Sequence, residues 1–466
     1  MADPTPTDDS GVTGNPNLPD SSDGQKATLA DELPPEILVY IFEMAQNTFL
    51  PSEEDLLWRF PLVLGMVSQY WRQVAYGAPM LWSNVNISHD RDLDGLQVYL
   101  GRSKDVPIDL HATYDGTYAP GERDVSMLIG ILRLHYPRCR SIRLSSETPD
   151  KITAEVMSIL GSMCEGRYPM LQRFHVEGFD TGEGSEPRAI VADALNLTNV
   201  RLRGLGLTYC RPPLTAATEL HLAISTGTIP YAYFYGMLGS CQSLITLCVY
   251  DDLVFGWPTN LRTVHDMPSL RYLRIFGNML GVSQLLLSIS APCLEELTIA
   301  PVVMSDLDIL HEGASRNAPR FPALKSLTLA PAHADAMEST LSLANTCFPG
   351  IKLLILPNYY KVSFIESFKT GELNPSEQLW PELDGLAVRD IDERQDQVVL
   401  YEFIKFRQSL GVPLRTLYLD SSSIPRMTRM DWLKDRLSVV EADPWKIQCQ
   451  NAFYCNEEDR FLGAEE

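Results

Sequence analysis

The sequence predicts a mixed α+β protein, with a short helical module followed by a long array of strands and return segments. Three observations lead to this prediction. Apolar residues recur at helical spacing within residues 35–76, and a strand-like pattern of six residues recurs along residues 139–419. Segments with helical spacing separate several of these copies. The composition is that of an ordinary folded chain, with 45% hydrophobic and 21% charged residues.

The first thirty residues differ in composition from the rest of the chain. Residues 1–30 are rich in Pro, Gly, Ser, Thr and Asp, and they contain no apolar segment typical of a secretory signal. Such a composition cannot bury enough apolar surface to order itself. We therefore expect a disordered acidic tail here.

The net charge and the cysteines indicate which partners and which compartment to expect. The 466 residues include 38 Lys and Arg and 60 Asp and Glu, which gives a net charge of −22. We expect no nucleic-acid partner, because phosphate backbones are bound by basic surfaces. No apolar run reaches the roughly 18 residues of a membrane span, so no membrane partner is expected either. The nine cysteines form no C-x-x-C pair, which is typical of reduced thiols in a cytoplasmic and/or nuclear protein.

The helical module is expected to begin at Asp31. Pro35 stands where a helix can start, because its missing N–H costs nothing in the first turn. One apolar stripe follows, formed by Ile37, Leu38, Ile41, Phe42 and Ala45. Residues 62–76 carry a second stripe, formed by Leu64, Val67, Trp71, Val74 and Ala75. Val85 and Ile87 then alternate with polar residues, as at the start of a strand.

The order of these residues resembles a known motif. Leu33-Pro34-Pro35-Glu36-Ile37-Leu38 is followed by Ile41-Phe42, then by Val67-Ser68 with Trp71-Arg72, then by Leu81-Trp82. This succession, over residues 31–82, resembles the F-box, as found in the large fungal F-box families. Two features depart from the family pattern. Ser68 stands where a cysteine is common, and the connection over residues 48–59 is longer than in compact members.

The resemblance implies a partner. In that family, the F-box docks on the Skp-type linker of a cullin-based ubiquitin ligase. The residues that match the docking motif are Leu33, Pro34, Ile37, Leu38, Ile41, Phe42, Val67, Trp71, Leu81 and Trp82. Some of them must form the core of the module, since a unit of about 50 residues has little burial available. The sequence does not separate the core residues from those that touch the linker.

From Cys139 onward, one template recurs: apolar-x-x-apolar-x-apolar. Its eleven copies begin at residues 139, 171, 197, 217, 244, 270, 294, 324, 351, 383 and 414. Successive copies are 20 to 32 residues apart. Helical spacing is found between copies at residues 154–164, 282–290, 334–347 and 397–410. Each unit is therefore expected to be a short strand with a helical or irregular return.

Units of this kind must stack on their neighbours, because none can bury its apolar face alone. The pattern resembles a degenerate leucine-rich repeat array, without its regular asparagine positions, and implies an α/β solenoid. An α/β-barrel is the alternative, although it predicts about eight strands buried on both faces. The expected division is a tail at 1–30, the F-box at 31–82, an irregular connecting region at 83–138, the solenoid at 139–430, and a C-terminal cap and tail at 431–466.

The fifth residue of each copy is expected to point away from the core, onto the concave face. In the N-terminal half of the array, this position holds Arg143, His175, Arg201, His221 and Arg274. In a chain of net charge −22, these residues suggest a surface for an acidic or phosphorylated segment of a target. The alternative is that they pair with Glu and Asp residues of neighbouring loops.

No catalytic or cofactor motif was found. The sequence lacks GxxxxGK[ST], HExxH, GxSxG and GxGxxG, and its histidines show no metal-ligand spacing. We therefore expect no catalytic residue, no metal and no cofactor. The predicted function is that of a substrate receptor, with the F-box bound to the linker and cullin and the repeats bound to a target protein. The alternative is a leucine-rich-repeat interaction scaffold without ubiquitin-ligase function.

Overall fold

The computed structural model describes residues 33–48, 54–88, 93–114, 122–146, 153–178, 188–224, 228–250, 252–258, 264–276, 281–302, 304–314, 320–331, 343–356, 380–389, 391 and 394–442. The tail expected at residues 1–30 and the end of the chain beyond residue 442 lie outside the described residues. Within them, the protein is a mixture of helices and strands with one large parallel sheet.

In the described part of the N-terminal module there are four short helices. They are α1 (Pro35–Gln46), α2 (Glu54–Val67), α3 (Gln69–Gly77) and the 3-10 helix η3 (Pro79–Trp82). Helix α1 begins at Pro35, as the sequence predicts. The single stripe expected over residues 62–76 is divided between two helices, because Ser68 is extended and its Oγ accepts a hydrogen bond from Trp71 N at 3.1 Å. Ser68 is thus the N-cap of α3.

Fourteen strands form the large sheet, and every neighbouring pair in it is parallel. They are β1 (Asn84–Ser88), β2 (Ile108–Tyr114), β3 (Cys139–Ser146), β4 (Arg173–Gly178), β6 (Asn199–Gly204), β8 (Glu219–Ala223), β10 (Thr246–Tyr250), β13 (Tyr272–Phe276), β15 (Glu296–Val302), β16 (Ser326–Pro331), β17 (Leu353–Leu356), β18 (Gly385–Val388), β19 (Thr416–Leu419) and β20 (Ser438–Glu441). Their order in the sheet follows the order of the chain.

Helices and short strands return the chain from one sheet strand to the next. The helices are α4 (Leu93–Arg102), α5 (Glu122–Arg133), η4 (Tyr136–Arg138), α6 (Thr153–Met163), α7 (Leu205–Tyr209), α8 (Tyr231–Ser240), α9 (Val282–Ser288), α10 (Met304–Ala314), α13 (Arg394–Ser409), η7 (Ile424–Arg426) and α14 (Met430–Lys434). Three two-stranded sheets join β5 (Arg188–Ala189) to β7 (Cys210–Arg211), β9 (Ile229–Pro230) to β11 (Val254–Phe255), and β12 (His265–Asp266) to β14 (Ile289–Ser290).

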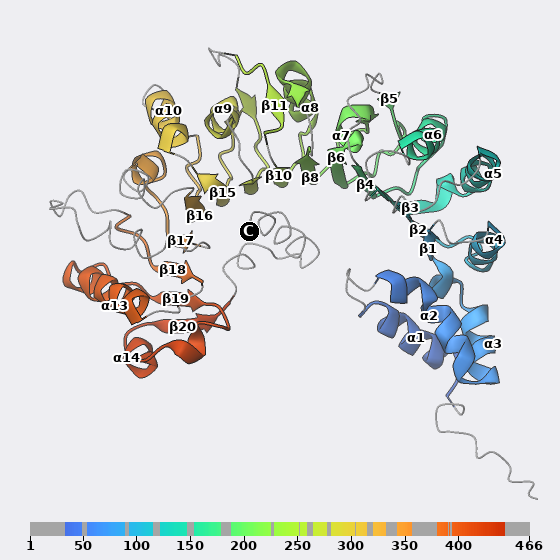
Figure 1. Cartoon of the computed structure of the whole chain (residues 1–466), viewed down its shortest axis with the longest axis horizontal. Helices are drawn as coiled ribbons and strands as arrows, with labels where there is room; N and C mark the ends of the chain where they lie inside the picture. The colour runs from blue at the N-terminus through green and yellow to red at the C-terminus, as the bar shows by residue number, and fades with distance from the viewer. Residues whose placement is uncertain are drawn as a thin grey trace, which may run out of the picture.

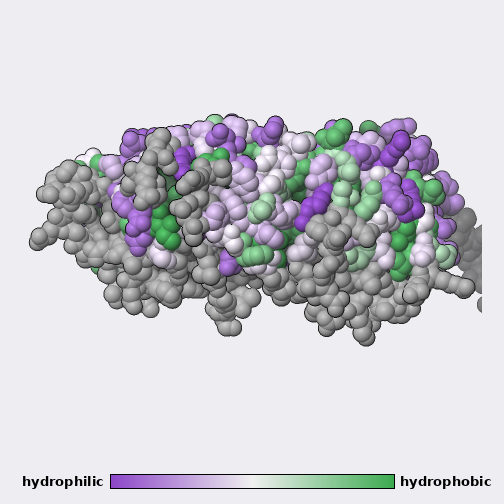
Figure 2. Space-filling view, turned by 90° about the horizontal axis from the view of Figure 1, so that it is seen from above, coloured by the Kyte–Doolittle hydropathy of each residue, from purple (hydrophilic) through white to green (hydrophobic). Residues whose placement is uncertain are grey.

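The sheet curves into an arch, with its strands on the inner side and the helices on the outer side (Figure 1). The helical module lies at one end of the arch, and α14 and β20 lie at the other. Figure 2 looks onto the outer side, where small hydrophobic areas are separated by hydrophilic ones. The inner side of the sheet is therefore the side that the helices leave uncovered.

The apolar positions of the template form the core between sheet and helices. In the second copy, for example, Leu171, Phe174 and Val176 are fully buried. The corresponding residues of neighbouring strands join them in one continuous cluster that extends from Val85 to Leu437. Burial of each such side chain contributes about 1.5–3 kcal/mol, so each strand depends on its neighbours for its stability.

The sheet is longer than the eleven copies of the template. It begins at β1 rather than at Cys139, and it continues through β20. Three further copies of the template, at β1, β2 and β20, were not recognised in the sequence. The copy at β1 begins at Trp82, which also completes the helical motif. The copy at β2 begins at Pro107, and in the copy at β20 Arg436 and Glu441 replace apolar residues. The connecting region at 83–138 and the start of the C-terminal cap therefore contribute strands to the same sheet.

The return helices agree with the sequence where the structure describes them. Helices α6, α9 and α13 match the predicted helical segments at 154–164, 282–290 and 397–410 within a few residues. Strands β1 and β20 are the two edges of the sheet within the described part of the chain. The sheet is thus open, which excludes the closed α/β-barrel.

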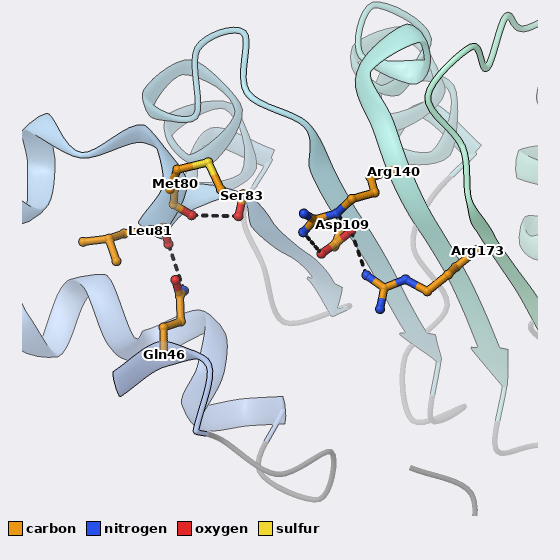
Figure 3. Close-up of polar contacts among 7 residues, drawn as sticks. All are labelled: Gln46, Met80, Leu81, Ser83, Asp109, Arg140 and Arg173. Atoms are coloured by element: carbon orange, nitrogen blue, oxygen red, sulfur yellow. Dashed lines mark hydrogen bonds and ion pairs between the residues drawn. The ribbon is translucent and has the colours of Figure 1, made fainter. Parts of the chain in front are cut away.

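Hydrogen bonds hold the helical module together and join it to the first strands. Within the module, Gln46 Nε2 of α1 donates to Leu81 O of η3 at 3.2 Å (Figure 3). Between the two parts, Asp109 N of β2 donates to Ser83 O, directly after η3, at 2.9 Å. The hydroxyl group of Tyr99, on α4, donates to Trp58 O of α2 at 2.6 Å. These contacts fix the module against the edge of the sheet, so both parts have a defined relative orientation.

Candidate functional site

Four of the ten predicted docking residues form the core of the helical module. Leu38, Phe42 and Leu81 are each 1% exposed, and Trp82 is fully buried. They pack in one cluster that is separate from the main core. These residues hold the module together, and their side chains are not available to a partner.

Aromatic contacts position this core. The rings of Phe42 and Trp71 lie 4.8 Å apart, and those of Trp82 and Tyr99 lie 4.7 Å apart. The indole N–H of Trp82 donates a hydrogen bond to Ala75 O at 2.9 Å, so its polar atom is satisfied inside the core. Trp71, which the motif includes, is partly buried against the cluster.

Other predicted docking residues lie on the surface. Ile37 is 49% exposed, Ile41 43% and Val67 58%, and Pro34 is also exposed. The structure therefore divides the ten residues into four buried, four exposed and two partly buried ones, Leu33 and Trp71, which the sequence could not do. An exposed Ile or Val on a folded module offers apolar surface to a partner.

The exposed residues have apolar neighbours that the sequence analysis did not include. On α1, Tyr40 and Met44 join Ile37 and Ile41 at i, i+3, i+4 and i+7. On α2, the exposed set is Leu62, Val63, Met66 and Val67. We call these two sets together the exposed apolar stripe. The signal was present in the sequence, because ILVYIF in α1 has more consecutive apolar residues than one buried face requires.

Hydrogen bonds join α3 both to the residues before α1 and to α2. The hydroxyl group of Tyr70, on α3, donates a hydrogen bond to Leu33 O at 2.6 Å. This bond places the residues before α1 beside the corner where α2 ends at Val67. Arg72 Nε donates to Gly65 O at 2.7 Å and holds α2 against α3 at the same corner. The stripe is therefore a surface of one rigid module.

A second candidate site lies on the inner face of the sheet. The pairing register aligns the predicted residues Arg143, His175, Arg201, His221 and Arg274. Together with Asn86, His111 and Cys248 they form one line across the strands, which we call the central row. The predicted residues therefore lie in one line across the sheet. Target binding by them stays a prediction.

Most of these side chains are engaged with groups on the same face. Arg201 Nε lies 3.0 Å from Glu177 Oε1, and His221 Nε2 lies 2.9 Å from Glu219 Oε1. His175 Nε2 lies 2.6 Å from Asn199 Oδ1. For Arg201 and His221, the structure thus agrees with the alternative of pairing within the protein. The carboxylates come from the sheet itself, and not from the loops.

Burial and pairing set the charge of these groups. Burial lowers the pKa of His175 to about 4, so it is neutral at pH 7. Burial alone would raise the pKa of Glu177, but Arg201 and Arg143 hold it below its usual value. Burial would lower the pKa of His221, but Cys248 and Glu219 outweigh burial and raise it to about 9. Glu177 is therefore negative and His221 positive at neutral pH.

A line of residues beside the central row was missed by the sequence analysis. Its members are Asn84, Asp109, Ser141, Arg173, Asn199 and Glu219, which we call the first row. They precede the central row by two positions, and a strand places such residues on the same face. In the template they occupy the third position, so the signal was available in the sequence.

A pocket of about 380 Å³ lies where the helical module meets this face. Leu57 and Trp58 of α2 line one side of it, and residues of the first and central rows line the other. Figure 3 shows Arg140 and Arg173 directed at Asp109 from two strands. Their guanidinium nitrogens lie 2.5 and 3.4 Å from its carboxylate.

Further along the arch, the inner face also carries apolar side chains. Ala223, Cys248, Tyr250, Phe276 and Ala300 form a small buried cluster of their own. The rings of Tyr250 and Phe276 stack with centroids 5.4 Å apart. Near its middle, the inner face thus combines this apolar cluster with the buried Arg274 of the central row.

No grouping typical of catalysis or metal binding was found in the described part of the chain. There, no three His, Cys, Asp or Glu residues lie together as metal ligands would. The seven described cysteines are free. Burial raises the pKa of the Cys139 thiol to about 12, which makes it a poor nucleophile. No described helix has the length and apolar character that a membrane span needs.

Comparison with known proteins gives no relative: no protein-family model matches this chain, and no curated protein matches its sequence. The exposed apolar stripe and the inner face of the sheet are therefore the two features of the molecule that bear on its function.

Proposed function

We propose that this protein is the substrate receptor of a cullin-based ubiquitin ligase. In this proposal, residues 31–82 are an F-box that binds a Skp-type linker, and the sheet with its helices is a leucine-rich-repeat-like solenoid that binds a target protein. The observation that carries the proposal is the exposed apolar stripe. Helices α1 and α2 expose Ile37, Ile41 and Val67 on a module whose own core is already filled by other residues of the motif.

The arrangement of the stripe suits a helical partner. Apolar residues at i, i+3, i+4 and i+7 are those with which one helix packs into the groove of another. The stripe on α1 is 43–63% exposed over four such residues. Its burial against a linker would remove apolar surface from water, which is the main favourable term in most protein association.

The sheet supports the second half of the proposal. Fourteen parallel strands in chain order, with the described return helices on the outer side, are consistent with the eleven template copies. Extended curved surfaces of this kind are used by repeat proteins to bind other proteins. The contacts of α2 and α4 with β1 fix the helical module against the sheet, so they would hold a bound target at a defined position relative to the linker.

The receptor would perform no chemistry of its own. Its contribution would be proximity, because a bound target has a high effective concentration at the ligase. We propose a cytoplasmic or nuclear location, where reduced cysteines are expected.

Titration of the purified full chain with a purified Skp-type linker tests the proposal. We expect the wild type to bind, and Ile37→Asp/Ile41→Asp to bind at least 100-fold more weakly, because it buries two unpaired charges at the interface. The matched control is Ile309→Asp/Val398→Asp, which changes residues of similar exposure on α10 and α13. The control should bind as the wild type does. A wild type that does not bind, or equal binding by both variants, would leave the protein as a repeat scaffold outside the ligase.

A further inference from the structure

The middle of the inner face carries the inference. Beyond Arg274, the pairing register continues the line of the central row through four residues, which we call the middle residues: Thr298, Thr328, Ile355 and Ala387. They are 3%, 2%, 0% and 0% exposed, respectively. They lie on β15 to β18, and the described helices are on the other side of these strands (Figure 1). The middle residues are therefore buried on a side that no described helix covers.

Neighbouring strands do not account for this burial. In the sheet, Ile355 lies between Thr328 and Ala387, which both have shorter side chains. Side chains stand out from the plane of a sheet, so two shorter neighbours leave the end of an isoleucine uncovered. Ile355 also belongs neither to the main core cluster nor to the small cluster that contains Phe276. Its burial therefore requires an occupant on the inner face.

Residues 443–466 are the segment with the freedom and the length to be this occupant. They follow β20, so they are not a connection between two of the fourteen strands. Ala442 N donates a hydrogen bond to Leu419 O at 2.8 Å, which holds the chain at the end of β20. From there, 24 residues reach up to about 80 Å when extended. Strand β17, which carries Ile355, is three strands away, or about 15 Å.

The composition of this segment suits burial. Four of its 24 residues are aromatic, namely Trp445, Phe453, Tyr454 and Phe461, whereas residues 1–30 contain no aromatic residue. Segments that stay disordered have few aromatic residues, and aromatic side chains gain much from burial. The inner face offers apolar surface beside the middle residues, because Ala300 of the small cluster lies on β15 two positions after Thr298.

We propose that residues 443–466 bind along the inner face over the middle residues, and that a target has to displace them to bind there. Their aromatic side chains would pack on Ile355 and on the small cluster that contains Phe276. The docking itself does not depend on the proposed function, and only the competition with a target rests on it. The protein would thus regulate access to its own target surface.

Alkylation of a reporter thiol tests the docking in the full chain. In Ile355→Cys, the rate of reaction with N-ethylmaleimide is measured for each cysteine by mass spectrometry. Cys293, which is exposed, and Cys139, which is buried in the main core, are native references. We expect position 355 to react at least 100-fold more slowly than Cys293, because reactivity requires access to the thiol. A rate equal to that of Cys293 would overturn the proposal.

Substitutions then identify the occupant. Adding Phe453→Ser/Tyr454→Ser should speed alkylation at position 355 at least tenfold, while Cys139 stays unreactive and shows that the core is folded. The matched control is Phe364→Ser/Phe368→Ser, which removes two aromatic residues from the connection between β17 and β18. It should leave the rate low. An unchanged rate in the first variant, or release by the control variant instead, would overturn the proposal.

A synthetic peptide tests the same contact in trans. The peptide of residues 443–466, made with Cys449→Ser/Cys455→Ser to prevent its own alkylation, should restore protection at position 355 in the Phe453→Ser/Tyr454→Ser protein. The same peptide carrying the two aromatic substitutions should not. Equal protection by both peptides, or protection by neither, would contradict docking through these aromatic residues.

Linker titration on the same samples keeps the two proposals separate. Linker binding together with fast alkylation at position 355 would retain the receptor function and reject this inference. Slow alkylation that Phe453→Ser/Tyr454→Ser releases, without linker binding, would support the docking and reject the receptor function.

Discussion

Replacing neighbouring residues of α1 should have opposite consequences, depending on which side of the helix they occupy. Ile41 is 43% exposed and Leu38 only 1%. Complete burial of such a side chain contributes about 1.5–3 kcal/mol, so the exposed part of Ile41 has about 1 kcal/mol to gain from burial in a complex. Ile41→Ala should therefore weaken linker binding about fivefold. Ile37→Ala/Ile41→Ala should weaken it by about 2 kcal/mol, or roughly 30-fold.

Leu38→Ala should instead act on stability. Truncation of a buried leucine costs about 2–5 kcal/mol, which is a large part of the stability of so small a module. Hydrogen exchange of the amides of α1, read together with linker affinity by calorimetry, separates the two effects. We expect fast exchange in Leu38→Ala and native exchange in Ile37→Ala/Ile41→Ala. Ile309→Ala, at 41% exposure on α10, is the matched surface control.

The reasoning would be refuted by a reversal of these readouts. If Ile37→Ala/Ile41→Ala bound the linker as tightly as Ile309→Ala does, the exposed apolar stripe would not be a docking surface. If it exchanged as fast as Leu38→Ala, the assignment of core and surface in α1 would be wrong.

Three further predictions concern stability. Trp82→Ala should cost about 3–5 kcal/mol and expose α4 amides to exchange, since the fully buried indole packs against that helix; unchanged exchange would contradict it. Burial raises the pKa of Glu296 from 4.5 to about 7. Between these pH values the native state keeps a proton that the unfolded state has lost. The free energy of unfolding should therefore fall by at most about 3 kcal/mol as the pH rises from 4.5 to 7. The urea midpoint of Glu296→Gln should therefore change less between pH 5 and pH 8 than that of the wild type. An equal fall in both proteins would show that Glu296 is not the group responsible. Buried Arg407 donates to two main-chain carbonyls at 2.9 and 3.1 Å, so Arg407→Met should lower the free energy of unfolding, measured by urea titration, by about 2–4 kcal/mol. Exposed Arg415→Met should leave it unchanged.

Much of the sheet could be predicted from the sequence because its apolar template repeats. The third and fifth residues of each copy lie on one face by strand geometry alone, so the alignment of Arg143 with His175 and Arg201 follows from counting. Counting along the template fails where the leading residue of a copy is not apolar. At β20, Arg436 before the strand and Glu441 at its end stand at template positions, and pairing with β19 holds the strand in the sheet.

The candidate sites were less predictable, for a different reason. A motif names positions, but only packing decides which side of a helix is covered. Leu38 and Ile37 are adjacent in the motif and equally apolar, yet one is buried and the other is half exposed. In the same way, the partner of Arg201 is Glu177 on the neighbouring strand, and no pattern within one copy shows that pairing. The pocket depends on Trp58, which lies far in sequence from the strands it faces.

Co-purification of the tagged full chain with its cellular Skp-type linker and cullin tests the central claim most directly. Ile37→Asp/Ile41→Asp and Ile309→Asp/Val398→Asp should be expressed to the same level beside the wild type. The account predicts that the wild type and the second variant retain both partners, and that the first variant loses both. Recovery of the wild type without linker and cullin, or equal recovery from all three proteins, would contradict it.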